Sequence, residues 1–266
     1  QTSDLLASLP RRARRDALRT LRGTLLHSET YALDNSPLQD RPYTVTENLM
    51  GLRMEFEPSQ NPGLFAGWKK SGQGYWAGSG YVFFPFGVAQ HTTQYERGND
   101  PMHSFSFTKE YDTYGNAIGQ LSVGLPRGAN PLGGGNGSCL GTYGINEYIY
   151  KDIANGQYMV DRVKRSISYD ATRIANSTSI FAYRDAVFDS NTLPVIGCTL
   201  SYYDGEAFQG LPYGKIGRFG VPVRSETLVI TDEIIADAYG VNTPECFKPT
   251  PDWGSANEYH AAFEGL

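Results

Sequence analysis

The chain has 266 residues, of which 40% are hydrophobic and 19% charged, which is enough apolar material for one large domain or two ordinary ones. The formal net charge of -5 gives no reason to expect nucleic acid as a partner, and no apolar run approaches the ~20 residues that cross a bilayer, so direct membrane insertion is not expected. With 30 Gly, 18 Tyr and 13 Phe, the composition favours sheet, because aromatic side chains suit pleated surfaces and glycine suits turns.

The first predicted element is an amphipathic helix within residues 1–26, in which Pro10 suits a first helical turn. Apolar residues recur at helical spacing at Ala13, Ala17, Leu18, Leu21 and Leu25. Arginines, among them Arg11 and Arg15, crowd the other face. Three interpretations of that face are open: a solvated surface, which charge runs usually form, a docking surface for an acidic patch of a longer polypeptide, and a phosphate site.

After this helix, period-two alternation predicts strands separated by turns. Residues 58–80 interrupt it as a long loop or irregular hairpin, and Pro85 marks the edge or the end of a strand. The predicted strands are residues 43–47, 52–57, 81–86, 104–111, 117–123, 147–151, 158–169, 179–188, 195–203 and 221–230. A short helix over residues 232–239, capped by Thr231 and closed by Gly240, follows them. We therefore divide the chain into a helix at 1–26, a β-rich segment at 27–240 and an irregular Pro-rich tail at 241–266.

One hairpin is predicted with a specific turn. Tyr111 and Asp112 end a strand, Gly115 and Asn116 are residue types that tolerate positive φ, and an alternating strand then returns. Tyr-Asp recurs at residues 169–170 and 203–204. The intervals are irregular, so no regular repeat array is predicted.

Catalytic patterns are missing from the sequence. Its four histidines form no H-x-H or H-x-x-x-H pair, it has no G-x-S-x-G elbow, and its Gly-rich stretches lack the Lys-Ser/Thr of a phosphate-binding loop. We predict no enzyme activity, no metal and no cofactor. Cys139, Cys198 and Cys246 form no C-x-x-C pair, and either free buried thiols or one disulfide fits their spacing, with free thiols favoured.

Two functions of other classes remain as alternatives. Trp68, Tyr75 and Trp76 lie close together in the Gly-rich stretch 65–81, as aromatic side chains that stack on sugars often do, so a carbohydrate-binding module is one alternative. Aromatic residues that fill a loop core produce the same pattern more often. A secreted hydrolase is a weaker alternative, which no motif supports.

Several blocks together carry a family resemblance. The sequence YDTYGN at residues 111–116 resembles the Y-D-x-x-G-N unit of Rhs proteins. The ordered set of blocks resembles the middle region of the B component of bacterial insecticidal toxin complexes, the Tc toxins and their SpvB-like relatives. These blocks are LRGTLLHSETYALD at 21–34, PYTVTE at 42–47, QYER at 94–97, LSVGLPR at 121–127, YYDG at 202–205, GLPYG at 210–214 and VRSETLV at 223–229.

The resemblance implies an architecture and a set of partners. The expected fold is mainly β, an extended curled antiparallel sheet of hairpins with an N-terminal helix and one short helix in the C-terminal half. In such complexes the B and C components wind strands into a hollow shell around the toxic C-terminal part of the C component, and other regions of the B component dock on the pore-forming A component. The chain is therefore expected to be a secreted structural scaffold. The missing initial Met also suggests a piece of a longer protein.

Overall fold

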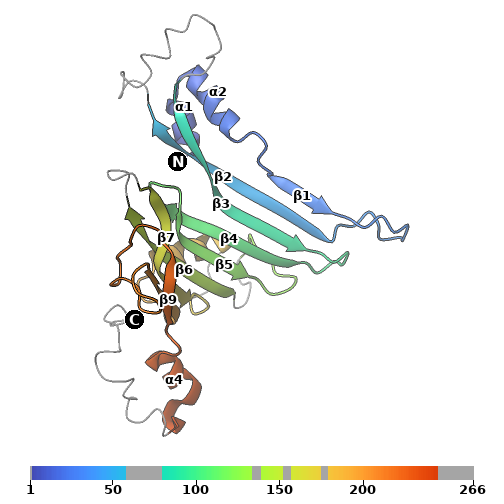
Figure 1. Cartoon of the computed structure of the whole chain (residues 1–266). Coiled ribbons are helices and arrows are strands. Elements are labelled where there is room, and N and C mark those ends of the chain that lie inside the picture. Colours follow the sequence, from blue (N-terminus) through green and yellow to red (C-terminus); the bar gives the residue numbers. More distant parts are fainter. Residues whose placement is uncertain (1, 58–79, 134–138, 152–156, 175–178, 245–266) are drawn as a thin grey trace, which may run out of the picture. The chain divides into compact units, whose positions relative to one another are not determined.

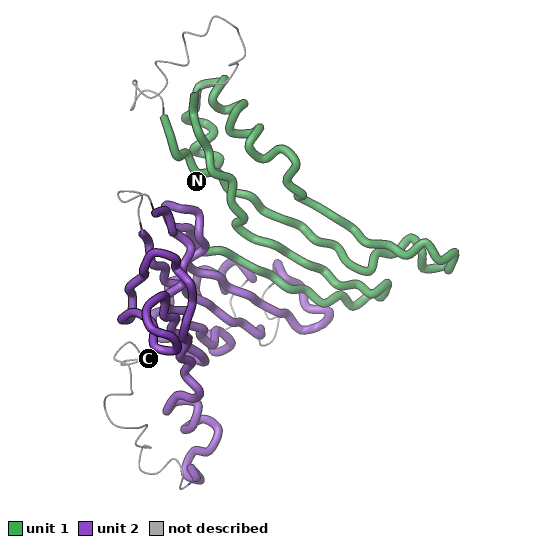
Figure 2. Tube along the Cα trace, viewed as in Figure 1, with its two compact units in different colours: residues 1–108 green, residues 109–266 purple. Residues whose placement is uncertain are grey.

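The computed structural model describes residues 2–57, 80–133, 139–151, 157–174 and 179–244 (Figure 1). The chain divides into two compact units, residues 1–108 and residues 109–266 (Figure 2). The described residues are mainly β, with nine strands in one antiparallel sheet whose order follows the chain from β1 to β9. The predicted fold class is confirmed in these terms.

The described helices are α1 (Thr2–Ser8), α2 (Arg11–Thr20), α3 (Ile180–Asp189) and α4 (Asp232–Tyr239), the last followed by the 3-10 turn η3 (Gly240–Asn242). The strands are β1 (His27–Thr30), β2 (Thr44–Phe56), β3 (Val82–Gln94), β4 (Met102–Tyr111), β5 (Ala117–Gly124), β6 (Leu140–Lys151), β7 (Met159–Asp170), β8 (Val195–Tyr203) and β9 (Pro222–Thr227).

The sheet is a meander, because every strand lies beside its neighbours in sequence. Within each unit the strands form an open sheet that is not strongly curled (Figure 1), which corrects the expectation of a curled sheet. The physical reason is the strand order. β1 and β9 stand at its two ends, so the ordinary twist between neighbouring strands acts without a closing pair of strands.

The N-terminal helices pack on β2 and β3 in the first unit. Their buried core consists of Leu9, Ala13, Ala17, Leu52 and Phe83. A single helix was expected, but Pro10 separates α1 from α2, because an extended proline begins α2 and cannot continue α1. Leu18 is half exposed and Leu25 lies beyond the helix, so these two residues do not belong to the packed face.

The strands of the first unit are longer than the alternation predicts. Residues 43–47 and 52–57 are parts of the single strand β2, which has a register shift between Leu49 and Met50. β3 continues past Pro85, which pairs with Leu52. Pairing of β3 with β4 begins only at Ala89, so Pro85 stands where β3 has β2 on one side alone. Pro85 therefore marks an edge and not an end.

The strand predicted over residues 179–188 is wrong, because this stretch is helix α3. The Ser179 hydroxyl caps it by accepting a hydrogen bond from the Ala182 N–H at 3.3 Å. Ile180, Tyr183 and Val187 are buried on one helical face. A run of ten residues satisfies both periodicities, and the packing of this face decides between them.

The second unit has its own core on β7 and β8. Its buried members are Ile167, Val195, Cys198, Leu200 and Tyr202. The predicted helix over residues 232–239 is confirmed as α4, where the Thr231 hydroxyl accepts from the Ile234 N–H at 3.2 Å and Gly240 takes a φ of 53°. These local caps explain why this short helix is readable from the sequence.

Candidate functional site

The hairpin between β4 and β5 is organised around one carboxylate. Asp112 Oδ1 accepts hydrogen bonds from the backbone N–H groups of Tyr114 at 2.9 Å and Asn116 at 2.7 Å. Asp112 Oδ2 accepts from the Asn116 Nδ2 at 2.8 Å. The Asp112 N–H in turn donates to the Asn116 carbonyl at 2.9 Å, so the first and last residues of the turn are joined three ways. Gly115 takes a φ of 91°, which a residue with a Cβ resists.

The turn is tied to the neighbouring strands of the second unit. The Tyr150 hydroxyl donates to Asp112 Oδ2 at 2.7 Å, and the Asn116 Nδ2 also donates to the Val160 carbonyl at 2.6 Å. Burial opposes the charge of Asp112, but the hydrogen bonds from Asn116, Tyr150 and the backbone outweigh it and lower the pKa of this carboxyl. Burial, followed by the bond to Asp112, raises the pKa of Tyr150 to about 12.

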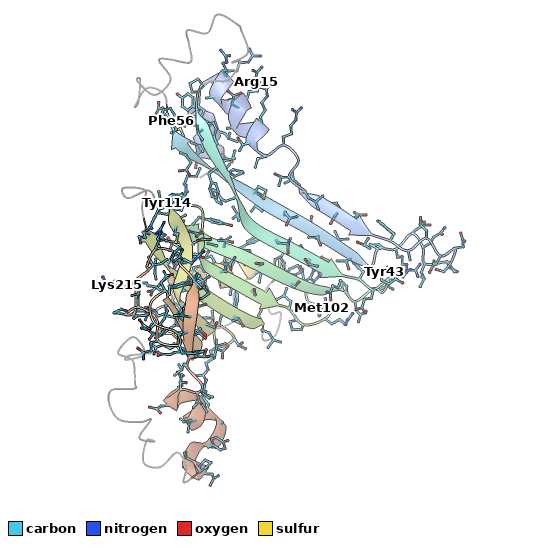
Figure 3. All side chains as sticks on the ribbon, viewed as in Figure 1. Arg15, Tyr43, Phe56, Met102, Tyr114 and Lys215 are labelled. Carbon is cyan, nitrogen blue, oxygen red and sulfur yellow. The ribbon has the colours of Figure 1, made fainter. Side chains whose placement is uncertain are left out.

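Three tyrosines gather beside this turn. The Tyr114 ring (Figure 3) lies 5.0 Å from the ring of Tyr150 and 6.1 Å from that of Tyr158. All three remain partly exposed. The chemistry available here is hydrogen bonding and aromatic contact, which suits the support of a turn or a protein surface.

The other two Tyr-Asp pairs also stand at strand ends. Asp170, the last residue of β7, accepts the Thr172 N–H at 2.8 Å. Asp204 directly follows β8. In each place the carboxylate takes up backbone N–H groups of the chain that leaves the strand, so the recurrence is one of local turn chemistry and not of a regular repeat.

Asp204 makes the most extensive of these turns. Its carboxylate accepts backbone N–H groups from Gly217 at 2.7 Å, Gly220 at 2.9 Å and Val221 at 3.2 Å. Burial opposes ionisation, but these backbone bonds together lower the pKa of Asp204. One carboxylate thus joins the end of β8 to the segment that enters β9.

An ion pair joins two further sequence blocks in the first unit. The Arg97 guanidinium donates to Asp34 Oδ2 at 2.8 Å and Oδ1 at 3.0 Å, and also to Ser36 Oγ at 2.9 Å. It lies 5.2 Å from the Tyr43 ring centroid. The hydrogen bonds from Arg97, followed by those from Ser36, hold the pKa of Asp34 well below its ordinary value. Sequence blocks far apart in the chain therefore meet at one place.

The remaining predicted contact residues lie on α2 or outside the described residues. Arg11 and Arg15 are exposed on α2 in the first unit, and Figure 3 labels Arg15, whereas the hairpin at 111–116 belongs to the second unit. Trp68, Tyr75 and Trp76 lie outside the described residues. The carbohydrate site therefore stays a prediction.

Three further predictions concern chemistry and membranes. Cys139 and Cys198 are free and buried, and Cys246 lies outside the described residues. The described part of the chain contains no group of three His, Cys, Asp or Glu side chains suited to a metal ion. None of its helices has the length and apolar character that crossing a bilayer requires.

The sequence patterns missed the contacts that depend on strand register. Asp34 and Arg97 carry no pairing signal in the sequence, and neither do His91 and His103, whose rings stack across β3 and β4. The predicted strands show which residues share a face. Only the register shows which of them are neighbours.

Comparison with known proteins finds a resemblance over the N-terminal part of the chain. Residues 16–64 match the model of the insecticide toxin TcdB middle/C-terminal region. The resemblance to a Tc toxin B component is confirmed. No match was found among the curated proteins.

Solved Tc toxin structures share the fold of this chain. The crystal structure of TcdB2-TccC3 superposes with a TM-score of 0.63 at 21% identity, covering 89% of this chain and 12% of that chain. The crystal structure of TcdB2-TccC3-Cdc42 gives 0.62 at 22% identity, covering 87% and 11%. The Photorhabdus luminescens Tc holotoxin pore, with the mutation TccC3-D651A, gives 0.60 at 20% identity, covering 86% and 11%. The chain thus spans only 11–12% of the length of these solved chains.

Proposed function

We propose that this chain is a wall segment of a toxin-complex B component. In this role residues 27–240 form part of the hollow shell that B and C components build around the toxic C-terminal part of the C component. The observation that carries the proposal is the shared fold, which covers 86–89% of the chain against the Tc toxin structures. The match of residues 16–64 to the TcdB middle/C-terminal model supports it from the sequence.

The burial of the strands supports a wall. In β5 Leu121 and Val123 are buried while Gln120 and Ser122 are exposed. In β4 Phe105 is buried beside the exposed Ser104. An antiparallel sheet with one packed and one solvated face can separate two compartments without any catalytic group.

The proposal has three further parts. The partners are the C component, which completes the shell, and the pore-forming A component, which other regions of the B component contact. The assembly is secreted. The segment itself catalyses nothing, so a broad screen for ester and glycoside hydrolysis is expected to show no turnover, and turnover that a point substitution abolishes would contradict this part.

Electron microscopy of the full-length B component in complex with its C component tests the location. We expect residues 27–240 in the wall of a hollow particle. Strands β1–β9 lying outside any hollow wall would overturn the proposal.

A protection assay tests the role. The hairpin variant Gly115→Val is introduced into the full-length B component, which is assembled with the C component and treated with protease. A weakened wall is expected to let protease reach the enclosed domain sooner than in the wild type. Gly124→Ala is the control, because a Cβ at this glycine meets nothing within 4 Å. Equal protection in all three, with Gly115→Val measurably destabilised, would mean that the hairpin plays no part in enclosure.

The carbohydrate-binding alternative has a separate test. A glycan array probed with the wild-type chain and with Trp76→Ala distinguishes it. Binding that the substitution abolishes would favour this alternative, and an array without binding would remove it.

A further inference from the structure

Two histidines form a close pair in the first unit, on the adjacent strands β3 and β4. His91 Nε2 lies 3.0 Å from His103 Nδ1, and the two rings stack with their centroids 5.2 Å apart. Thr93 Oγ1 lies 3.2 Å from the same His91 nitrogen and 3.3 Å from the same His103 nitrogen. The two imidazoles therefore face each other through one nitrogen each, with a hydroxyl beside them.

A carboxylate stands on the other side of His91. Glu47 on β2 pairs with His91 in the register, and its Oε2 lies 3.1 Å from His91 Nδ1. His103 and Thr93 are only 8% and 4% exposed, whereas the Glu47 side chain is 56% exposed. Glu47, His91 and His103 thus form a row, which runs from a solvated carboxylate through His91 to an almost buried imidazole.

The number of protons on the two rings decides which hydrogen bonds this row can make. With both rings neutral, His91 donates from Nδ1 to the Glu47 carboxylate and accepts at Nε2 from His103 Nδ1. With one added proton, His91 donates from both nitrogens, to Glu47 and to His103 Nδ1, and every contact is still satisfied. With a second proton, His91 Nε2 and His103 Nδ1 are both donors at 3.0 Å, and two like charges face each other in a largely buried place.

Few other charges can compensate for that second proton. On β1, His27 lies 2.8 Å from Glu29 and 4.0 Å from Glu47, so it competes for the carboxylate that faces His91. The ring of Phe105 on β4, which is uncharged, stacks on the His91 ring with 4.2 Å between the centroids.

Neither β5 nor α2 brings a charge to the pair. β5, the strand after β4, contains no ionisable residue. The arginines of α2 belong to the helix that packs at Phe83, eight residues before His91 and roughly 26 Å away along the strand. Among the described residues, Glu47 is the carboxylate that contacts the pair.

We propose that the His91–His103 pair is an acid-sensitive joint between β3 and β4. It retains one proton without loss of contacts, and a second proton separates the two strands at this end of the first unit. The joint converts mild acidification into local opening of the sheet.

The electrostatics of His103 agree with this geometry. Burial first, and the nearby His91 second, lower the pKa of His103 below its ordinary value of 6.5. A base with a depressed folded-state pKa contributes stability that is fully present above 6.5 and is lost as the pH falls through the folded value. The joint therefore loosens on the acid side of neutrality.

Hydrogen exchange of the full 266-residue chain tests the joint. Exchange rates of the amides of residues 91–94 and 102–105, corrected for intrinsic rates, are compared at several pH values from above 6.5 to below the His103 transition. In the wild type we expect these amides to lose protection by roughly tenfold for each pKa unit that separates folded from unfolded His103. His103→Gln is expected to lose this dependence, because the variant has only the His91 ring and no second imidazolium can face it.

His27→Gln is the matched control, because it removes the half-exposed histidine of β1 and leaves the stacked pair intact. It should keep the wild-type dependence. The same pH dependence in His103→Gln as in the wild type would overturn the proposal.

Ring NMR of the wild-type chain gives a second readout that needs no variant. The His103 ring is expected to titrate below its ordinary pKa of 6.5. A single independent step for His103 near 6.5 would also overturn the proposal.

Discussion

The Asp34 carboxylate accepts hydrogen bonds from both terminal nitrogens of the Arg97 guanidinium, although the two residues are 63 positions apart in the sequence. The Arg97 side chain is 10% exposed and also donates to the Leu38 carbonyl at 3.1 Å. This single guanidinium therefore holds the loop between β1 and β2 against the loop that leaves β3.

Arg97→Lys should lower the melting temperature of the chain by several degrees. A lysine keeps the charge but cannot make two parallel hydrogen bonds to one carboxylate. Thermal unfolding followed by circular dichroism measures the shift. Arg184→Lys is the control, because Arg184 pairs with its sequence neighbour Asp185, whose side chain is 59% exposed, and there we expect a smaller shift. Equal melting temperatures for Arg97→Lys and the wild type would show that the two parallel hydrogen bonds to Asp34 add no stability.

The same pair predicts a pH dependence. The pKa of the Asp34 carboxyl is depressed in the folded chain. Asp34 therefore contributes stability that is present above its ordinary pKa of 3.8 and is lost as the pH falls through its folded-state pKa. The difference in melting temperature between the wild type and Asp34→Asn should be full at neutral pH and shrink only below 3.8. A difference that already disappears near neutrality would contradict this assignment.

Gly115→Val should destabilise the chain by about 1–3 kcal/mol, because a β-branched residue resists the positive φ of this turn. Gly115→Asn should cost less, since asparagine visits the left-handed region more readily. Chemical denaturation of the two variants beside Gly124→Ala provides the comparison. If valine and asparagine cost the same, the backbone conformation of Gly115 is not the cause.

Asp112→Asn should cost about 1–3 kcal/mol, because the backbone and side-chain donors of the turn lose a charged acceptor. Tyr150→Phe removes a single donor to the same carboxylate and should cost about 1 kcal/mol. A double-mutant cycle by urea unfolding should give a coupling between the two substitutions. Additive effects would mean that the hydroxyl and the carboxylate stabilise the turn independently.

Gly141→Ala should destabilise the chain by about 1–3 kcal/mol, because the new Cβ would overlap the Tyr183 hydroxyl. That hydroxyl donates to the Ala171 carbonyl at 2.6 Å, which ties α3 to the end of β7. In the Tyr183→Phe background the overlap with the hydroxyl is gone and the tight contact with Ala171 Cβ at 3.0 Å remains, so adding Gly141→Ala should cost less there than in the wild type. Urea unfolding of the wild type, the two single variants and the double variant measures both costs. An equal cost of Gly141→Ala in both backgrounds would mean that the strain does not come from the Tyr183 hydroxyl.

The elements that the sequence predicts well are those with local causes. The turn after Tyr111 and the helix that Thr231 caps are each determined by residues within a few positions of one another. Helix α3 shows the limit, because its ten residues fit two periodicities and only the burial of Tyr183 and Val187 separates them. Likewise, the sequence around Pro85 fits both the edge and the end of a strand, and the pairing of β3 decides between them.

The sequence by itself determined a mainly β chain of hairpins, the residues of its carboxylate turns and its likeness to the Tc toxin B component. The tertiary structure alone decided that Arg97 reaches Asp34, that His91 faces His103 and that Gly141 leaves room for the Tyr183 hydroxyl. The physical reason is register. Alternation shows the face on which a side chain lies, but which side chains meet across strands depends on the pairing of whole strands and on the packing of the helices against them.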